Sequence, residues 1–130
     1  MGASITLTRR LEWMDTDAAV RWHHATTWRW AELAEAELHR SLGIIDMTFG
    51  CTPRRRVEAE FHRAVLFDDE VQIDFAVESV GRTSATYAME VRVGDEVAAT
   101  ARMVVVLVDD DGRPRPWPDD VADLLRGAGG

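Results

Sequence analysis

A carboxylate and an imidazole lie close together near the start of the chain. Asp17 comes shortly after the segment that begins at Leu11, and the pair His23-His24 follows it, directly before a helix signal. The first turn of a helix has unpaired N–H groups and partial positive charge, which stabilise a developing oxyanion. A carboxylate beside such amides can attack a carbonyl or deprotonate water. These residues are compatible with a hydrolytic site, although an aspartate after a strand is more often a turn former or a helix cap. If Asp17 is catalytic, its carboxylate must lie beside a cavity.

The neighbouring polar residues receive supporting or structural roles. Two adjacent residues diverge by about 100° on a helix and point to opposite faces of a strand, so His23 and His24 cannot both face one site. Only one of them can support Asp17, and the resemblance given below favours His24. For Asp15 we favour hydrogen bonding within the loop. A divalent metal could also be bound by four side chains of this segment, Asp15, Asp17, His23 and His24. Nothing downstream completes a ligand set, so we expect no metal. Cys51, the only cysteine, lacks the surroundings of a nucleophile.

Periodicity predicts the elements that position these residues. Apolar residues at helical spacing, followed by Gly43, predict one amphipathic helix over residues 25–42. Its polar side is expected to carry Arg29, Glu32, Glu35, His39 and Arg40. Alternating apolar residues predict strands at residues 4–13, 57–61, 71–78, 84–93 and 97–107, and a short helix follows at 118–125. The expected class is α+β, a single domain over residues 1–130 with one helix against an antiparallel sheet.

Charge and composition exclude several classes of partner. The net charge of −8 disfavours nucleic acid and anionic membranes. The 15 basic residues are all arginines, which excludes Schiff-base chemistry and a Walker-type phosphate loop because both need lysine. The longest apolar run, residues 103–108, is too short to cross a bilayer. The N-terminus lacks a basic region followed by an apolar core, so we expect no signal peptide and a cytoplasmic protein.

Short motifs, in their order and spacing, carry a resemblance over nearly the whole chain. Asp15–Val20 is similar to an Asp-x-Asp-x-x-Gly loop, and Arg29–Ala34 to a helix pattern of the type Arg/Tyr-Trp/Phe-x-Asp/Glu-Ala. Further matches are Thr52-Pro53, Asp68–Val71 and Gly81–Ser84. The chain thus resembles the 4-hydroxybenzoyl-CoA thioesterase branch of the hotdog-fold superfamily. The resemblance implies the hotdog fold, in which a curved five-stranded antiparallel sheet wraps one long helix.

The resemblance also implies an activity and a set of site residues. Asp17 matches the family's catalytic aspartate, the nucleophile or general base on a thioester carbonyl, with the oxyanion stabilised at the helix N-terminus. His24 resembles the assisting histidine of the subgroup associated with the Tol–Pal system. Arg82 and Ser84 are similar to residues that meet the phosphates of CoA. An acyl-CoA substrate is implied, with no cofactor apart from the CoA that it carries. The family further implies a homodimer with a continuous sheet, often paired into a tetramer, and active sites at the subunit interface.

Two departures and several alternatives accompany this interpretation. Val20 replaces the loop glycine, and its branched side chain resists a positive φ, so substrate access or the oxyanion contact is expected to differ. Thr27 replaces a tyrosine that is usual early in the helix. The alternatives are a non-catalytic acyl-thioester binding protein, an acyl carrier protein thioesterase, and a hydratase or dehydratase, whose histidine motif with downstream glycines is absent. We interpret Arg54–Arg56 as a solvated surface run and not as a phosphate clamp.

Overall fold

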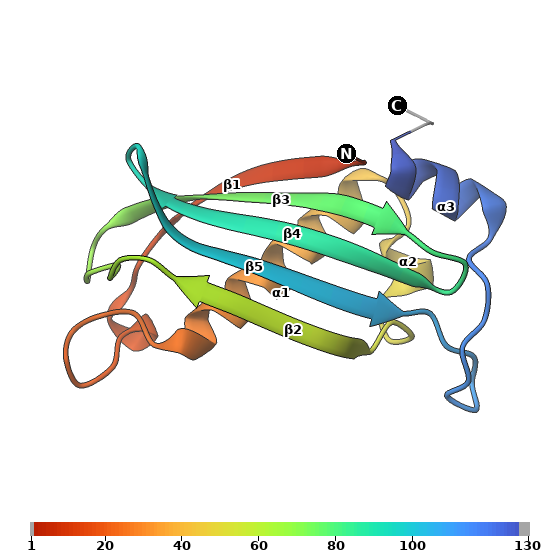
Figure 1. Ribbon diagram of the computed structural model, residues 1–130, viewed down its shortest axis with the longest axis horizontal. Helices are drawn as coiled ribbons and strands as arrows, with labels where there is room; N and C mark the ends of the chain where they lie inside the picture. Colours follow the sequence, from red (N-terminus) through yellow and green to blue (C-terminus); the bar gives the residue numbers. More distant parts are fainter. Residues whose placement is uncertain (1, 128–130) are drawn as a thin grey trace.

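The computed structural model describes residues 2–127, in which five strands form one antiparallel sheet of order β1-β3-β4-β5-β2. The strands are β1 (Ser4–Arg10), β2 (Arg54–Phe61), β3 (Glu70–Val80), β4 (Ser84–Val93) and β5 (Glu96–Val106). The helices are α1 (His24–Ser41), α2 (Ile45–Thr48) and α3 (Asp119–Arg126), and a short 3-10 turn, η1, spans Trp13–Asp15. Figure 1 shows this arrangement, in which β1 and β2 form the two edges of the sheet. The expected α+β class is confirmed.

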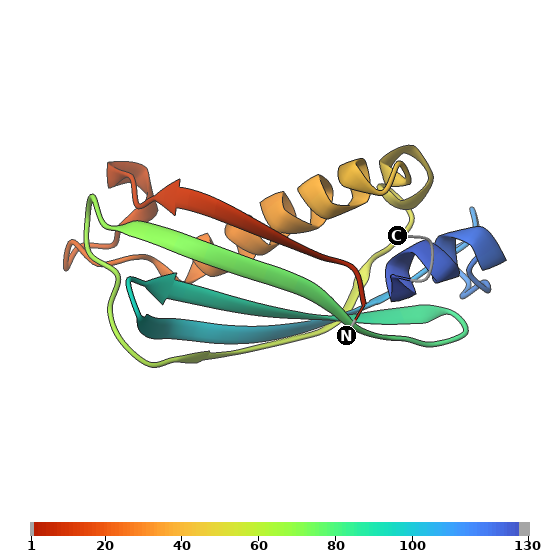
Figure 2. The ribbon, with the colours of Figure 1, turned by 90° about the horizontal axis from the view of Figure 1, so that it is seen from above.

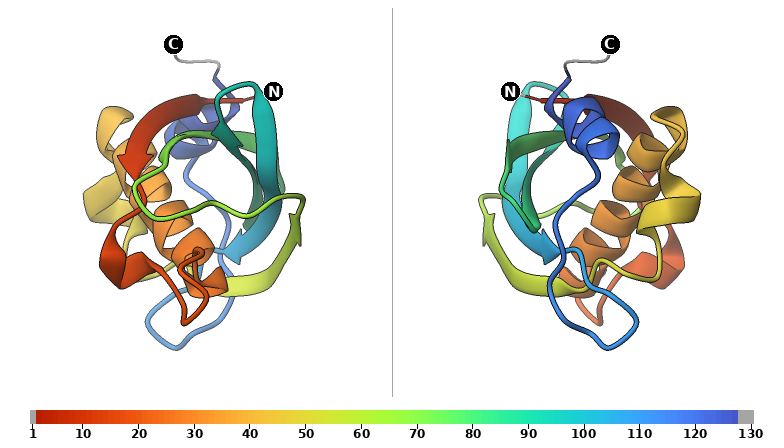
Figure 3. Two further views of the ribbon diagram at one scale, coloured as in Figure 1. Left: turned by 90° about the vertical axis from the view of Figure 1, so that its left-hand side faces the viewer. Right: turned by 90° about the vertical axis from the view of Figure 1, so that its right-hand side faces the viewer.

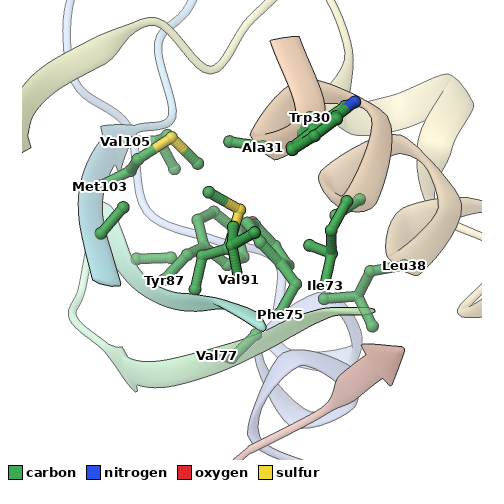
Figure 4. Packing of buried hydrophobic residues seen from close by; sticks show 14 of the residues in the cluster. Trp30, Ala31, Leu38, Ile73, Phe75, Val77, Tyr87, Val91, Met103 and Val105 are labelled. Carbon is green, nitrogen blue, oxygen red and sulfur yellow. The ribbon is translucent and has the colours of Figure 1, made fainter. Parts of the chain in front are cut away.

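The sheet curls around α1, as the side and end views show (Figures 2 and 3). Its concave face carries the alternating apolar residues that the sequence predicted, such as Ile73 and Phe75 on β3. The Phe75 ring stacks on Tyr87 with a centroid distance of 4.9 Å. Trp30 and Leu38 of α1 pack on this layer (Figure 4). Burial of these apolar side chains is the main stabilising contribution to the fold.

The first strand is shorter than expected. β1 ends at Arg10, and a 3-10 turn begins at Trp13. The Glu12 N–H donates to the Asp15 carboxylate at 2.9 Å, which caps the turn and ends the extended backbone. Trp13 therefore does not continue the strand, and its side chain is largely exposed. The turn redirects the chain from the β1 edge toward the start of α1.

The side of α1 that we expected to be solvated is partly buried. Glu35 and His39 are 2% and 0% exposed, so the assignment of these two residues to the polar surface is wrong. The short helix α2 and the start of β2 cover this side of α1. Glu35 pairs with Arg54, and His39 contacts Thr48 of α2. The sequence pattern could not predict this cover because α2 carries no long periodic signal.

A β-bulge explains the behaviour of the arginine run. In the β2–β5 ladder, Arg54 pairs with Val105 and Arg56 with Val104, so Arg55 is the extra residue. A bulge re-aims the side chains on one side of it. Arg54 consequently shares the helix-facing side of the sheet and contacts Glu35. All three arginines are exposed as expected, but the side chain of Arg54 also reaches inward to pair with the buried Glu35, so solvation describes Arg54 only in part.

The C-terminal segment closes one end of the sheet. The expected short helix is present as α3, and the Ala3 N–H donates to the Leu125 carbonyl at 3.0 Å. Figure 1 shows α3 beside the start of β1, at the end opposite the loop between β1 and α1. None of the helices among residues 2–127 combines the length and the apolar character needed to span a bilayer.

Candidate active site

The loop between η1 and α1 holds the predicted catalytic residues. It lies at the end of the sheet where β2 finishes, and the Trp22 ring contacts Phe61 edge to face with a centroid distance of 5.4 Å. An isolated bridge joins Arg21 to Leu66, and the Trp22 N–H donates to the Val65 carbonyl at 2.9 Å. The loop is thus attached to the segment between β2 and β3. In Figure 1 it is the orange loop at the left.

Asp17 lies within a closed turn of this loop. Its N–H donates to the Arg21 carbonyl at 2.7 Å, and its Oδ1 accepts the Ala19 N–H at 2.8 Å. The Arg21 N–H lies 3.5 Å from the same oxygen. No hydrogen bond to Oδ2 is found among residues 2–127, and the side chain is exposed. One carboxylate oxygen is therefore held by the backbone, and the other is available to a ligand.

Val20, which stands where the family motif has glycine, adopts a left-handed backbone conformation of the kind that favours glycine. Its φ is +62°, in the left-handed region that costs a non-glycine residue roughly 1–2 kcal/mol. A β-branched residue in this region is a clear outlier. The turn thus keeps the backbone path expected of glycine, and the Val20 N–H donates to the Asp17 carbonyl at 3.0 Å. The Val20 side chain is exposed, so it changes the surface beside Asp17 and not the course of the loop.

The start of α1 offers fewer free amides than expected. His23 is the N-cap residue, and its Nδ1 accepts the Ala25 N–H at 3.0 Å. The Thr26 N–H donates to the His23 carbonyl at 2.9 Å. For the main-chain N–H of His24, no acceptor is found among the described residues. This amide is the remaining donor for an oxyanion at the positive end of the helix dipole.

The two histidines are closer to each other than the sequence argument allowed. Their ring centroids are 4.5 Å apart with planes inclined at 30°. His23 has an extended backbone and His24 begins the helix, so neither the strand rule nor the helix rule applies to the pair. The expectation that they diverge is wrong. Both rings are exposed beside the loop.

Asp15 and Thr27 have structural surroundings. Asp15 is 2% exposed, and its carboxylate forms an ion pair with Arg29. This agrees with the loop-bonding role that we favoured. Thr27, which replaces the usual tyrosine, is fully buried, and its hydroxyl makes no hydrogen bond within residues 2–127. Neither residue reaches the surface that Asp17 faces.

Arg82 and Ser84 lie at the other end of the sheet. Arg82 lies in the turn between β3 and β4, and Ser84 is the first residue of β4. The 11 residues of β3 separate this turn from the loop of Asp17, a span of roughly 35 Å. The Arg82 side chain is exposed. The Ser84 carbonyl accepts the Trp117 indole N–H at 2.9 Å. One chain therefore does not bring these residues together with Asp17.

Two cavities among the described residues include neither Asp17 nor His24. The larger one, about 710 Å³, lies on the outer face of the sheet and is lined by residues such as Thr6, Asp74 and Arg102. The smaller one, about 280 Å³, lies between α1 and the start of β2, and is lined by Glu32, Glu35, Phe49, Gly50, Thr52 and Arg54. Neither of these two cavities in the isolated chain therefore adjoins the Asp17 carboxylate, although we expect a catalytic residue to adjoin one.

A buried polar cluster beside the smaller cavity was missed by the sequence analysis. Glu35 and Arg54 pair through two contacts of 2.7 and 3.0 Å. Burial raises the pKa of Glu35 above its usual range, partly offset by Arg54. Burial, together with the charge of Arg54, lowers the pKa of His39 to about 4, so the ring is neutral at pH 7. The i, i+4 spacing of Glu35 and His39 is a signal that could have suggested a shared polar stripe.

The partners of His39 define its tautomer. The Thr48 hydroxyl donates to the Ile44 carbonyl at 3.1 Å, so it accepts the Nδ1–H of His39 at 2.5 Å. The His39 Nε2 then accepts the Tyr87 hydroxyl at 2.7 Å. Each polar side-chain atom of this network has a partner, as buried polar groups require. We therefore assign the His39 network to the core and not to catalysis.

Metal binding by the loop finds no support in the geometry. Within the part of the chain that the structure describes, no three His, Cys, Asp or Glu side chains are grouped as metal ligands. Asp15 points into the protein and is occupied by Arg29, whereas Asp17 faces solvent. The four residues considered for a metal site thus do not converge.

Comparisons with known proteins address the family. The family model described as the thioesterase-like superfamily matches residues 10–125. No curated protein matches the chain. Among solved structures, a predicted thioesterase from Bacillus stearothermophilus is 28% identical, with a TM-score of 0.86 and 95% of each chain covered. A thioesterase from Thermus thermophilus, complexed with coenzyme A and zinc, is 25% identical, with a TM-score of 0.80 over 92% of this chain and 91% of that chain.

The fold is shared with a further enzyme. A 4-hydroxybenzoyl-CoA thioesterase mutant, complexed with 4-hydroxybenzoyl-CoA, has a TM-score of 0.83 over 95% of this chain and 99% of that chain. Its sequence identity is 21%, so this similarity concerns the fold alone. Together with the family match, it confirms the hotdog fold and the resemblance predicted from the sequence.

Proposed function

Because the chain belongs to the thioesterase-like superfamily, we propose that it is an acyl-CoA thioesterase that hydrolyses its substrate to a free acid and CoA. The observation that carries the proposal is the state of Asp17. One of its carboxylate oxygens is held by the Ala19 N–H, and the other is free in a loop that leads directly to the start of α1. A carboxylate in this state is fixed in orientation and still able to react.

The chemistry requires two groups. Asp17 either attacks the thioester carbonyl carbon, expelling the CoA thiolate and forming an anhydride that water opens, or it removes a proton from the water that attacks. In both routes negative charge develops on the carbonyl oxygen. The free N–H of His24, at the positive end of α1, is the proposed donor to that oxygen. The His24 imidazole is proposed to position the water or the carboxylate.

The backbone at Val20 favours hydrolysis over a binding-only function. A residue that resisted the left-handed conformation would deform the turn around Asp17 and remove the reason to expect catalysis. Val20 instead occupies that conformation with a φ of +62°. The loop of a protein selected only to bind thioesters has no evident need to retain this strained conformation.

We further propose that the active site is completed by a second copy of the chain. β2 is an edge strand, and an exposed edge favours pairing with another strand. Arginines occupy the first part of β2 and glutamates its second part. Antiparallel pairing of two β2 edges about a two-fold axis would bring opposite charges together. The result is the homodimer with a continuous sheet that the family implies. We also propose, from the same family resemblance, that two such dimers pair into a tetramer.

This pairing accounts for the separation of Asp17 from Arg82 and Ser84. The Asp17 loop lies at the end of the sheet where β2 finishes, and Arg82 lies at the end where β2 begins. A two-fold axis that pairs the two β2 strands antiparallel places the Arg82 end of one subunit beside the Asp17 end of the other. Arg82 and Ser84 are therefore proposed to meet the CoA phosphates of a substrate whose thioester lies at the partner's Asp17. Exposure of Asp17 in the isolated chain agrees with a site that needs both subunits.

The test is hydrolysis of a panel of acyl-CoAs with aromatic, branched and straight acyl groups, followed with a thiol reagent. We expect release of CoA from at least one member of the panel. Tight binding of an acyl-CoA without release of CoA would instead support the binding-only alternative. Hydrolysis of acyl groups only when they are attached to acyl carrier protein would support the acyl carrier protein thioesterase. Single turnover in oxygen-18 water then distinguishes the two routes, because label in the Asp17 carboxylate indicates the anhydride.

A further inference from the structure

We propose that Asp15 is a positioning residue: from its buried place at the base of the loop, it fixes the position of the Asp17 carboxylate. This inference rests on the proposed function. The Asp15 side chain is 2% exposed, and its Oδ2 accepts the Glu12 N–H at 2.9 Å. Its carboxylate also forms the ion pair with Arg29 on α1. One side chain therefore joins the turn η1 to the second turn of the helix.

The main chain of Asp15 supplies the second pair of contacts. Its carbonyl accepts the His23 N–H at 2.7 Å and the Thr26 hydroxyl at 2.9 Å. The loop 16–22 consequently leaves Asp15 and returns to it. Both ends of the loop therefore contact one buried residue, Asp15. Its carbonyl accepts hydrogen bonds from the His23 N–H, at the end of the loop, and from the Thr26 hydroxyl, in the first turn of α1.

The loop itself is closed in a way that transmits this anchoring to Asp17. Thr16 and Trp22 form an isolated bridge, and Asp17 bonds to the Arg21 carbonyl inside it. The turn is thus a small hairpin whose base is Asp15 and whose tip carries Asp17. Movement of the base would displace the Asp17 carboxylate relative to the start of α1. The contacts of Trp22 with Val65 and Phe61, and the bridge between Arg21 and Leu66, hold only the returning side of this hairpin.

Energetics favours orientation over stability as the role of the Asp15–Arg29 pair. The cost of desolvating a buried carboxylate largely cancels its attraction to a guanidinium, so such a pair adds little net stability relative to an apolar pair. Catalytic groups must, however, stay within about 0.5 Å of the productive geometry. A displacement of about 1 Å can cost 100-fold in rate. The pair is suited to prevent that displacement.

The test compares three variants by kinetics and by NMR. Asp15→Asn retains an acceptor for the Glu12 N–H but removes the charge. Asp15→Asn with Arg29→Leu removes both charges, and Arg29→Lys keeps the charge but loses the fork that matches a carboxylate. We expect Asp15→Asn to lower kcat roughly 10- to 100-fold while KM changes less than about threefold, because positioning acts on the transition state. We expect a smaller loss, roughly 3- to 10-fold, for Arg29→Lys.

The double variant separates positioning from stability. It is expected to melt within about 5 °C of the native protein and still to have the low kcat of Asp15→Asn. Val121→Ala in α3 serves as the control. It removes buried apolar contacts far from the Asp17 loop, so it should lower the melting temperature of the protein and leave kcat unchanged. If Asp15→Asn fails to fold, the double variant and Arg29→Lys carry the same comparison.

A second readout does not depend on activity. The amide resonances of Asp17 and Ala19 are expected to shift in Asp15→Asn, while those of β3 and β4 stay in place. Unchanged loop resonances, or a kcat within twofold of native in both Asp15 variants, would overturn the inference. A native protein that hydrolyses no acyl-CoA would contradict the proposed function, and the resonances alone would then decide the role of Asp15. Loss of rate in Asp17→Asn with full rate in Asp15→Asn would contradict the positioning role only.

Discussion

Glu35 of α1 and Arg54 of β2 face each other across the interior with both carboxylate oxygens engaged, at 2.7 and 3.0 Å. The carboxylate is 2% exposed and the guanidinium about a third exposed, so most of the pair is withdrawn from water. The bulge at Arg55 is what turns Arg54 inward. The pair links the middle of the helix to the edge strand at which we propose that two subunits meet.

Removing one partner of this pair is predicted to be costly. Arg54→Met leaves the Glu35 charge buried without a partner. A fully buried pair broken in this way costs ~3–5 kcal/mol, and partial exposure of Arg54 lowers our expectation to roughly 2–3 kcal/mol. The free energy of unfolding in urea measures the loss. The matched control is the double change of Glu35 and Arg54 to Met, which should recover most of it. Equal losses in the single and double variants would contradict the assignment.

His39 is predicted to make stability fall in acid. Its pKa is lowered to about 4 in the folded protein, against 6.5 for the unfolded chain. The unfolded state therefore binds a proton first as the pH falls, and stability decreases from pH 6.5 down to about 4 by roughly 3 kcal/mol. Glu35 acts in the opposite direction: its raised pKa makes the folded state bind a proton first, so its contribution is largest in acid and is lost as the pH rises.

The two effects are separated by a substitution. His39→Gln cannot take up a proton, so the unfolding free energy of this variant should decrease less between pH 7 and pH 5 than that of the native protein. Urea unfolding at several pH values gives both curves. Parallel curves for the two proteins would show that His39 does not titrate differently on folding.

These cases show how far the sequence could predict the structure. Period-two alternation located β3 to β5, and helical spacing with Gly43 located α1 to within one residue at each end. The same periodicity misplaced Glu35 and His39, because a helical wheel records polarity and not which later segment covers a helix face. α2 and the bulge at Arg55 depend on tertiary contacts, and no local pattern predicts them.

The site was predicted less completely. The spacing of Asp15, Asp17 and His24 identified the loop, and the structure agrees with the structural role favoured for Asp15. The sequence could not show that His23 caps the helix through its ring, because Ser, Thr, Asp and Asn are the usual N-cap residues. It also could not show that Asp17 and Arg82 lie at opposite ends of one chain. That separation follows from the register of the strands.

Val20→Gly is predicted to stabilise the protein without a large gain in rate. Glycine removes the left-handed strain of roughly 1–2 kcal/mol but adds about 0.5–1 kcal/mol of unfolded-chain entropy, for a net gain of roughly 0.5–1 kcal/mol. The native turn already has the required backbone, so kcat should change less than about threefold. Thermal melting and acyl-CoA hydrolysis measure both. Ala18→Gly in the same loop is the control and should not stabilise. A rise in kcat of several orders of magnitude would mean that the Val20 side chain obstructs the substrate.

Charges on β2 are predicted to control association. If the Val57 residues of two subunits face each other, Arg56 lies opposite the partner subunit's Glu58 on the outer face of the sheet. Arg56→Glu then places like charges opposite each other twice per dimer, and should weaken the dimer roughly 10- to 100-fold. Exchange of the two charges, Arg56→Glu with Glu58→Arg, should restore association. Sedimentation equilibrium measures the dissociation constant. Native protein that is monomeric at high micromolar concentration would contradict the paired edge.

The rate of Asp17→Asn tests the central claim most directly. Asparagine keeps the size of the side chain and its Oδ1 contact with the Ala19 N–H, but it cannot act as a base or nucleophile. With the acyl-CoA that the native protein hydrolyses fastest, kcat should fall at least ~100-fold. Asp95→Asn, in the exposed turn between β4 and β5, should keep the native rate. A kcat for Asp17→Asn within twofold of native would contradict the account.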